Sequence, residues 1–231
     1  MHEAFRTDRS AAPGGVTLRW RRPGKTPGWL LGGFRPVVAI VAVVLAALLA
    51  LSAPARATWS IVLTDSATGE VAVATATCLE DFILKQFVPV IVVGVGAGAA
   101  QSQVDPTAKN KKLMRAELER GTDPTEIIQL LKANDPIGGL KCSRQYGIAD
   151  LQGRAAGFSG ACNGQWKGHL NGTDGTLTYS IQGNVLTGEA VLLAAEQAVL
   201  GTAGKLSDRL LAGMIAAAGM GGDGRCSCLG P

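Results

Sequence analysis

A threonine that becomes the first residue of a chain can do chemistry that an internal threonine cannot do. Signal peptidase requires small residues at the third and first positions before a cut, and Ala55 and Ala57 supply them ahead of Thr58. A threonine hydroxyl is a weak nucleophile, but the α-amine of the same residue, with a pKa of about 8, can take up its proton. Cleavage after Ala57 would therefore give Thr58 both a nucleophile and a general base.

The residues before Thr58 follow the order of a secretory signal peptide. A long basic stretch comes first, an uncharged apolar run of fifteen residues follows at 37–51, and small residues end the segment. A membrane-spanning helix needs about 20 apolar residues, so this run is short for an anchor, which is the alternative interpretation. We predict that residues 1–57 are a signal peptide with a long basic n-region and that the protein is secreted or periplasmic.

The net charge of the chain depends on this segment. The 231 residues carry 22 basic and 18 acidic side chains, a net charge of +4. Residues 1–57 hold eight of the basic and two of the acidic groups, which leaves 14 basic and 16 acidic groups, a net charge of −2, from Thr58 onward. A mature chain without excess basic charge gives no indication of nucleic-acid binding. Contact with a membrane is expected only through an uncleaved leader.

Few other residues of the mature sequence could carry out catalysis. Its one histidine, His169, falls in a glycine-rich segment that we predict to be a loop, and we interpret it as a surface or loop-packing residue. The segment 157–160, GFSG, does not match the G-x-S-x-G motif of serine hydrolases. A mechanism that needs no histidine, such as that of an N-terminal threonine, is consistent with this composition.

Five cysteines lie in the mature sequence, at positions 78, 142, 162, 226 and 228. An exported protein meets oxidising conditions, so disulfides are expected, with free thiols as the alternative and at least one cysteine left over. The cysteines form no C-x-x-C pair and are accompanied by a single histidine. We therefore predict no metal site and no other cofactor.

Strands and helices follow one another in groups along the mature sequence. The expected strands are 58–64, 71–77, 88–95, 99–103, 144–151, 154–159 and 177–182, and the apolar density of 88–95 predicts burial on both faces. The expected helices are 109–120, 124–133, 188–200 and 206–219, the second capped by Thr122 or Asp123, and 160–175 is expected to be a loop. This order predicts the α+β class and a four-layer αββα sandwich.

Several polar residues have a catalytic and an ordinary interpretation. Asn184 follows a predicted strand and could either donate its side-chain amide to an oxyanion or form a turn. Lys85 or Arg144 could lower the pKa of the Thr58 amine through their charge. Lys85 could instead form an ordinary helical ion pair with Asp81, four residues earlier.

The order and spacing of several segments resemble the bacterial and archaeal family catalogued as domain of unknown function 1028. The matching segments are Thr58-Trp59-Ser60-Ile61-Val62, Thr68 to Ala74, Gly94-Val95-Gly96-Ala97, Ala100 to Pro106, Arg144 to Asp150, Gln152 to Ala156, Gly160-Ala161-Cys162, Gln182-Gly183-Asn184 and Gly221 to Arg225. The resemblance implies an N-terminal-nucleophile hydrolase fold, the same αββα sandwich. Members typically begin Met-Thr, so that loss of Met exposes the same threonine. Some carry an added peptidoglycan-binding module, which implies a cell-wall or amide substrate.

The sequence departs from this family in two places. Asp105-Pro106 stands where the family commonly has Asn-Pro, and Pro231 ends the sequence where the family usually continues into another apolar strand. We predict that residues 58–231 form a single domain. Either the domain is truncated at its C-terminus or the cysteine-rich end replaces the missing strand.

Three hypotheses of function follow. The first is an amidohydrolase that attacks a peptide or cell-wall amide with Thr58, with Asn184 and Lys85 in catalytic roles and with Gln101, Asp105 and Arg144 binding the substrate. The second is a non-catalytic envelope module that binds peptide or peptidoglycan fragments. The third is a structural envelope protein with neither site. The expected partner is a small peptide-like or peptidoglycan-like substrate, and a homo-oligomer is left open.

Overall fold

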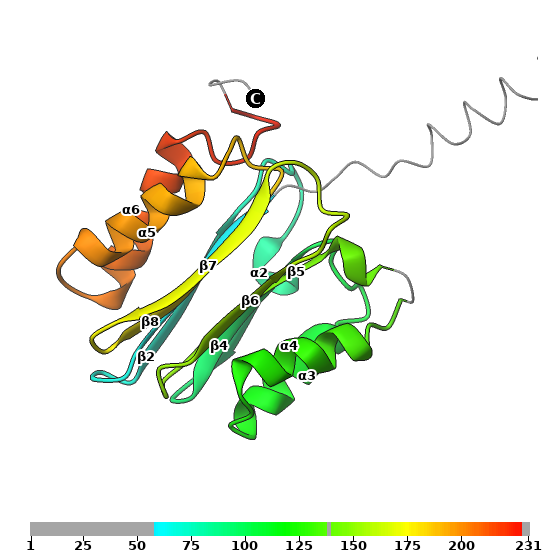
Figure 1. Cartoon of the computed structure of the whole chain (residues 1–231), viewed down its shortest axis with the longest axis horizontal. Coiled ribbons are helices and arrows are strands. Elements are labelled where there is room, and N and C mark those ends of the chain that lie inside the picture. Colours follow the sequence, from blue (N-terminus) through cyan, green and yellow to red (C-terminus); the bar gives the residue numbers. More distant parts are fainter. Residues whose placement is uncertain (1–57, 138–139, 228–231) are drawn as a thin grey trace, which may run out of the picture. The chain divides into compact units, whose positions relative to one another are not determined.

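The computed structural model of the chain describes residues 58–137 and 140–227. They form two four-stranded sheets and two pairs of longer helices, stacked as layers (Figure 1). The predicted signal peptide at 1–57 and Cys228 lie outside these described residues. Within the described ranges, no helix is long and apolar enough to cross a membrane.

The first sheet is antiparallel throughout and has the strand order β2-β1-β8-β7. Its strands are β1 (Thr58–Asp65), β2 (Glu70–Ala76), β7 (Lys167–Asp174) and β8 (Leu177–Asn184). β1 and β8 are neighbours in the centre of the sheet, although they are far apart in the sequence. This pairing sets Thr58 directly opposite Asn184.

The second sheet is also antiparallel and has the order β3-β4-β5-β6. Its strands are β3 (Pro89–Val92), β4 (Gly96–Ser102), β5 (Arg144–Asp150) and β6 (Ala155–Ser159). The short helix α2 (Leu84–Phe87) precedes β3, and the 3₁₀ turn η1 (Lys141–Ser143) precedes β5. Gly94 has a φ of +73° in the turn between β3 and β4, a conformation that glycine adopts without strain.

Two helix pairs cover the outer faces of the sheets (Figure 1). The helices α3 (Lys109–Glu119) and α4 (Pro124–Ala133) pack on the second sheet, and α5 (Ala190–Gly201) and α6 (Leu206–Gly219) pack on the first. The Asp123 side chain caps α4 by accepting a hydrogen bond of 2.8 Å from the Thr125 backbone N–H, as predicted. The predicted α+β class and the αββα layering are confirmed.

The side chains of β1 and β8 alternate between two environments. The odd-numbered Trp59, Ile61 and Leu63 pack with β8 residues against α5 and α6. The even-numbered Thr58, Ser60, Val62 and Thr64 therefore face the second sheet, because successive residues of a strand point to opposite faces. On β8 the same alternation sends Ser180, Gln182 and Asn184 into the space between the sheets, which is consequently rich in polar groups.

Three expectations from the sequence are wrong. The segment 160–175 is not all loop, because Lys167–Asp174 forms β7 and pairs along its whole length with β8. The strand predicted at 88–95 is not buried on both faces, because β3 is an edge strand in which Ile91 is 38% exposed. Asp81 has a φ of 56° and precedes α2, so it is not one helical turn from Lys85.

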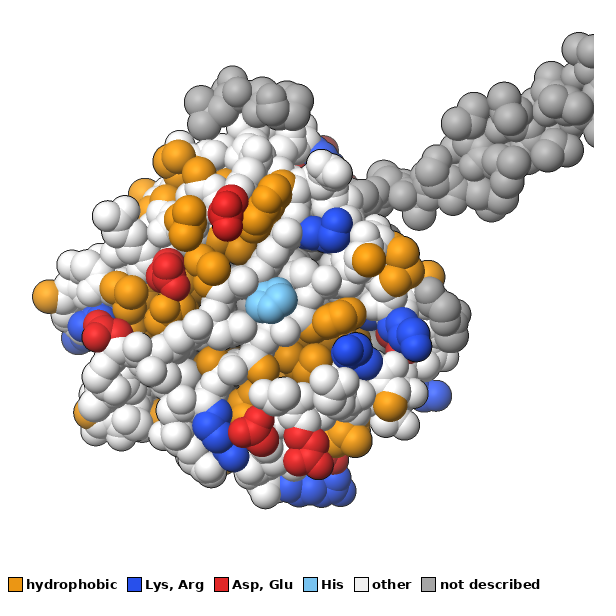
Figure 2. All heavy atoms as spheres, in the orientation of Figure 1, with side chains coloured by type: hydrophobic (Ala, Val, Ile, Leu, Met, Phe, Trp, Pro, Cys, Tyr) orange, Lys and Arg blue, Asp and Glu red, His pale blue; other side chains and the backbone are white. Residues whose placement is uncertain are grey.

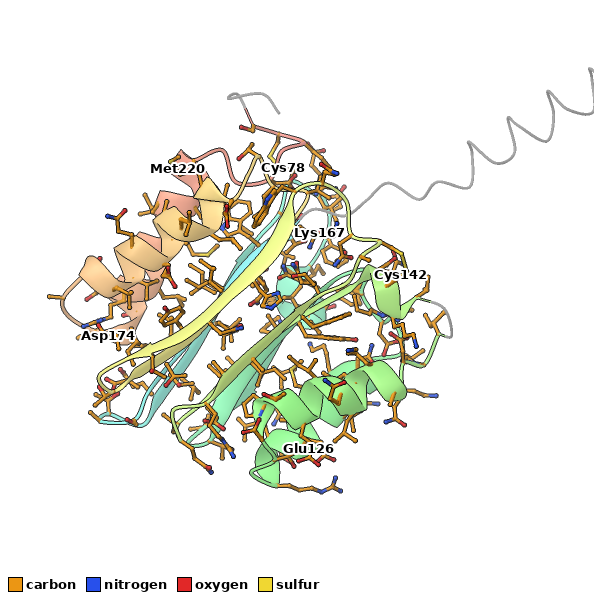
Figure 3. The ribbon with its side chains drawn as sticks, in the orientation of Figure 1. Cys78, Glu126, Cys142, Lys167, Asp174 and Met220 are labelled. Atoms are coloured by element: carbon orange, nitrogen blue, oxygen red, sulfur yellow. A yellow bond between two sulfur atoms is a disulfide. The ribbon has the colours of Figure 1, made fainter. Side chains whose placement is uncertain are left out.

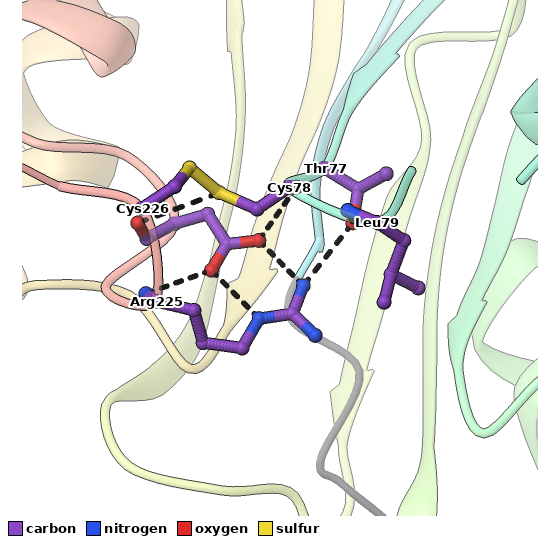
Figure 4. Close-up of a disulfide and its surroundings, with 6 residues drawn as sticks. Thr77, Cys78, Leu79, Arg225 and Cys226 are labelled. Atoms are coloured by element: carbon purple, nitrogen blue, oxygen red, sulfur yellow. Dashed lines mark hydrogen bonds and ion pairs between the residues drawn. A yellow bond between two sulfur atoms is a disulfide. The ribbon is translucent and has the colours of Figure 1, made fainter. Parts of the chain in front are cut away.

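Two disulfides join segments that are distant in sequence. Cys142 bonds to Cys162, and Cys78, just after β2, bonds to Cys226 in the C-terminal segment (Figure 4). The buried carboxylate of Asp223 accepts hydrogen bonds from the Cys78 backbone N–H at 2.9 Å and from the Arg225 guanidinium at 2.6 Å. The C-terminal segment is thereby fixed beside the end of β2.

Candidate active site

Thr58 is the first residue of β1 and lies at one end of the space between the sheets. It is 4% exposed in the uncleaved chain. Its carbonyl oxygen accepts a hydrogen bond of 2.9 Å from Gln101 Nε2 on the second sheet and one of 3.3 Å from Asn184 Nδ2 on its own sheet. Two predicted site residues therefore hold the backbone of Thr58 from both sheets.

A third amide, that of Gln145 on β5, connects the other two. Its Oε1 accepts from Gln101 Nε2 and from Asn184 Nδ2, both at 2.8 Å. Its Nε2 donates to the carbonyl oxygens of Gly183 at 2.7 Å and Gly168 at 3.1 Å. Gln145 is fully buried and bonds to both sheets, so it is the centre of this amide cluster, which we define as Gln101, Gln145 and Asn184.

Hydroxyl groups extend the amide cluster along β1. The Ser60 hydroxyl contacts Gln101 Oε1 and lies 3.0 Å from Thr75 Oγ1 on β2. Gly147 on β5 makes room for the neighbouring polar side chains, because a Cβ added there would lie 1.9 Å from Gln182 Oε1. Only glycine fits this position without displacing the polar layer.

The geometry of Asn184 can be compared with its two predicted roles, a donor to an oxyanion and a turn residue. It ends β8, is fully buried, and donates from Nδ2 to Thr58 and Gln145. Its Oδ1 is buried and accepts no hydrogen bond from the described residues. An unpaired acceptor beside Thr58 suits a freed α-amine better than an oxyanion, because only an N–H or O–H group can donate to it.

The predicted substrate-binding residues Gln101, Asp105 and Arg144 line one small pocket, together with Asn110, Lys111 and Tyr146. The pocket lies on the α3 side of the second sheet, because Arg144 and Tyr146 alternate with the inward-facing Gln145. The Gln101 amide bonds on the opposite side, to Thr58. Asp105 and Arg144 are thus near each other but do not reach Thr58 through any described contact.

Arg144 is already paired. It is 1% exposed, and its Nε and Nη2 donate to the two carboxylate oxygens of Asp135 at 2.7 and 2.9 Å. Burial acts to raise the pKa of the Asp135 carboxyl, but the hydrogen bonds from Arg144 and the Ile137 N–H, together with the charge of Arg144, outweigh it and hold this pKa below its usual value. The charge of Arg144 is largely neutralised by this pair. Lys85 is exposed on α2, and no described contact joins it to Thr58.

Two residues that sequence reasoning missed or discounted face the same space. Lys167, the first residue of β7, lies opposite Asn184, which in turn lies opposite Thr58, so the three occupy one row of the first sheet. Figure 3 shows Lys167 at the same end of the sandwich as Cys142 and far from Asp174. His169 is on β7 rather than in a loop, and its Nδ1 lies 3.1 Å from Ser159 Oγ. Lys167 and His169 lie two residues apart on the same face of β7. The glycines and asparagine of this strand are atypical of β-strands, so the sequence did not indicate it.

No side-chain arrangement in the described residues suggests a metal site, since no group of three or more His, Cys, Asp and Glu residues is placed to hold an ion. The groups described around Thr58 include buried amides and hydroxyls, and Lys167 and His169 lie on the same face of the first sheet. These groups can position a substrate and transfer protons.

A comparison of sequences identifies the family of the chain. The sequence profile of a family of unknown function, DUF1028, matches residues 58–228. The chain belongs to this family. The match begins at Thr58, the predicted first residue of the mature protein, and the DUF1028 resemblance inferred from the sequence is confirmed.

A solved structure of the same family is similar to the chain. Protein SPO2555 from Silicibacter pomeroyi, whose crystal structure is described as that of a DUF1028 protein, shares 27% sequence identity with a TM-score of 0.62. The alignment covers 71% of this chain and 71% of that chain. No protein of curated function matches this chain. The assignment of the DUF1028 domain to the N-terminal-nucleophile hydrolases stays a prediction.

Proposed function

We propose that the protein is an exported, N-terminal-nucleophile-type amidohydrolase that cleaves a peptide or cell-wall amide with Thr58. The observation that supports this most is the position of Thr58. It begins a central strand, faces the space between two sheets, and has its carbonyl held by Gln101 and Asn184. A nucleophile needs its own backbone fixed, because a misplacement of about 1 Å can cost a factor of about 100 in rate.

In this proposal the leader is removed first, in the secretory pathway, and the mature protein is secreted or periplasmic. The α-amine of Thr58 takes the proton of its own Oγ1 as Oγ1 attacks the amide carbonyl carbon. The amine then returns the proton to the leaving nitrogen, and water hydrolyses the acyl-enzyme ester. Asn184 Oδ1, the unpaired buried acceptor, orients the amine by accepting one of its hydrogens.

The proposal also includes a cation that lowers the pKa of the Thr58 α-amine. A nearby positive charge lowers the pKa of an amine and increases the unprotonated fraction that can act as a base. Lys167 is better placed for this than Lys85 or Arg144, because it shares the row of Thr58 and Asn184. Arg144 is paired with Asp135, and Lys85 has no described contact with Thr58.

The test is the hydrolysis of a library of peptides and peptidoglycan fragments by the exported protein, followed by mass spectrometry. The variant Thr58→Ala should lose activity at least 1,000-fold, an order of magnitude typical of a lost nucleophile. Thr58→Ser is the matched control and should keep measurable activity, because it retains a hydroxyl beside the α-amine. Equal cleavage by the wild type and Thr58→Ala would contradict the proposal.

The alternative is an envelope module that binds peptide or peptidoglycan fragments without cleaving them. Two observations favour it: Thr58 is almost fully buried, and the nitrogen of Asn184 is already engaged with Thr58 and Gln145. A ligand recovered unchanged after binding, with the same affinity for the wild type and Thr58→Ala, would support this alternative. A structural role with neither site predicts no saturable binding at all.

A further inference from the structure

The edge strands β6 and β7 of the two sheets lie side by side and bring Ser159 and His169 together. The His169 ring lies over Gly157, where an added Cβ would be 2.4 Å from ring carbon Cδ2. Both side chains are partly exposed, and the histidine is visible in pale blue on the face shown in Figure 2. The pair of Ser159 and His169 is therefore accessible from this face of the molecule, and it does not include Thr58.

The neighbours of Ser159 leave its hydrogen available to His169. Gln145 Oε1 accepts from two amides, so Gln145 Nε2 is the atom that faces Ser159 Oγ, at 2.8 Å, and it also lies within hydrogen-bond distance of the Gly183 and Gly168 carbonyl oxygens. An amide nitrogen does not accept a hydrogen bond, so the Ser159 hydroxyl can donate its hydrogen to His169 Nδ1, 3.1 Å away. In the tautomer that accepts this hydrogen, Nδ1 carries no hydrogen and the ring proton is on Nε2. This is the arrangement of a hydroxyl beside its general base.

The environment of His169 keeps it in the neutral form that a general base needs. Burial lowers its pKa below the ordinary 6.5, so the ring is unprotonated at neutral pH. Non-titratable groups face it from β6 (Gly157 and Ser159) and from β8 (Gln182, its register partner). Lys167 is the charged residue on the same face of β7, two residues before His169.

The backbone supplies a donor next to the Ser159 hydroxyl. β5 and β6 are joined by backbone hydrogen bonds at the even-numbered positions of β6. The Gly160 N–H donates to the Arg144 carbonyl at 2.9 Å, and the Asp150 N–H donates to the Arg154 carbonyl at 3.0 Å. The N–H of Ser159 lies between these positions and points away from β5. Because β6 is an edge strand, this N–H has no partner strand within the second sheet.

We propose that Ser159 and His169 form a second nucleophilic site, distinct from Thr58, which hydrolyses small carboxylic esters. Ser159 Oγ bonds to the ester carbonyl carbon while its proton passes to His169 Nδ1, and the Ser159 N–H donates to the developing oxyanion. The carbon–oxygen bond to the alcohol breaks, and the alcohol takes the proton from Nδ1. Water then hydrolyses the acyl-serine.

A fluorophosphonate probe and p-nitrophenyl acetate test this site in the full chain. The probe should label Ser159, as mapped by peptide mass spectrometry, with release of fluoride and the serine proton. Ser159→Ala and His169→Gln should each lower the acetate hydrolysis rate at least tenfold. The exposed Ser66→Ala is the control and should label and hydrolyse like the wild type. Labelling that maps to Ser159 and not to Thr58 separates this site from the one proposed at Thr58.

The pH profile distinguishes catalysis from a structural role of the pair. The labelling rate should rise to a plateau with a midpoint below pH 6.5, because only neutral His169 accepts the proton. Circular dichroism of each variant establishes that it is folded. If His169→Gln does not fold, the wild-type profile decides instead. Labelling of residues other than Ser159, no labelling at all, or a rate that does not depend on pH below 7 would overturn the proposal.

Discussion

Two parts of the space between the sheets are built from different side chains. In the apolar part, Val62 from β1 meets Ala97, Ala99 and Ala149 from the second sheet, all fully buried. In the polar part, at the start of β1, Thr58 meets the amide cluster of Gln101, Gln145 and Asn184, also buried. Apolar packing alone would hold the sheets together in both parts. Buried amides cost free energy unless every partner is in place, so their presence beside Thr58 indicates a site that needs exact positions.

Removing the centre of the amide cluster should have the largest effect on stability. Gln145→Leu would leave Gln101, Asn184 and Ser159 without a shared partner, and each unpaired buried group costs about 1–3 kcal/mol. We expect the free energy of unfolding in urea to fall by about 4 kcal/mol. The exposed Gln152→Leu is the matched control and should change it by less than about 0.5 kcal/mol. Equal effects of the two substitutions would mean that the cluster is not structurally important.

Overfilling the polar layer should have the next largest effect. The Cβ of Gly147→Ala would lie 1.9 Å from Gln182 Oε1 and 2.6 Å from Ser180 Oγ, so both side chains would have to move. We expect a loss of about 3 kcal/mol. Gly188→Ala, where nothing lies within 4 Å of the added atom, is the control. A Gly147→Ala variant as stable as the control would show that the polar layer adapts easily.

In the apolar part, Val62→Ala should remove packing without leaving a polar group unpaired. We expect a loss of about 2 kcal/mol, measured by urea denaturation, because Val62 is fully buried between the sheets. Val93→Ala, at a position that is 85% exposed, should have almost no effect. Enzymatic activity should be unchanged in both variants. A loss of activity in Val62→Ala with normal stability would contradict the separation of the apolar part from the polar part.

Acid should have the smallest effect and should not act through the amide cluster, whose groups do not titrate. Hydrogen bonds from Thr176 and Ala67 hold the pKa of Asp65 below 3.8, and the pKa values of Asp105 and Asp135 are also lowered despite their burial. Their stabilising contribution is complete above pH 3.8 and is lost as the pH falls through the folded-state values. Urea denaturation should therefore give a small loss of stability between pH 7 and 5, because burial lowers the pKa of His169 and the unfolded chain takes up that proton first, and a further loss at pH 3. A stability at pH 3 equal to that at pH 5 would contradict this.

The sequence predicted the elements whose residue pattern is determined locally. The capping aspartate of α4 and the alternation of Leu177–Asn184 give clear local signals, and both were predicted correctly in type. β7 was missed because Lys167–Asp174, KGHLNGTD, is a strand only through its pairing with β8. Its glycines accommodate neighbours such as the Tyr179 hydroxyl, which would lie 2.3 Å from a Cβ at Gly172.

The candidate site was predictable in part. Gln101 and Asn184 were selected from sequence, and the structure brings both to Thr58. The central role of Gln145 could not be predicted, because its bonds cross between sheets whose relative position no local pattern specifies. The contact between Ser159 and His169 depends in the same way on two edge strands meeting.

The mature N-terminus of the exported protein tests the central claim most directly. The full-length gene would be expressed in a secreting bacterium, and the exported protein would be examined by intact mass and N-terminal sequencing. We predict a chain that begins with Thr58, with a free α-amine. A mature chain that begins at any other residue, or one that keeps residues 1–57, would contradict the proposal that Thr58 is the nucleophile.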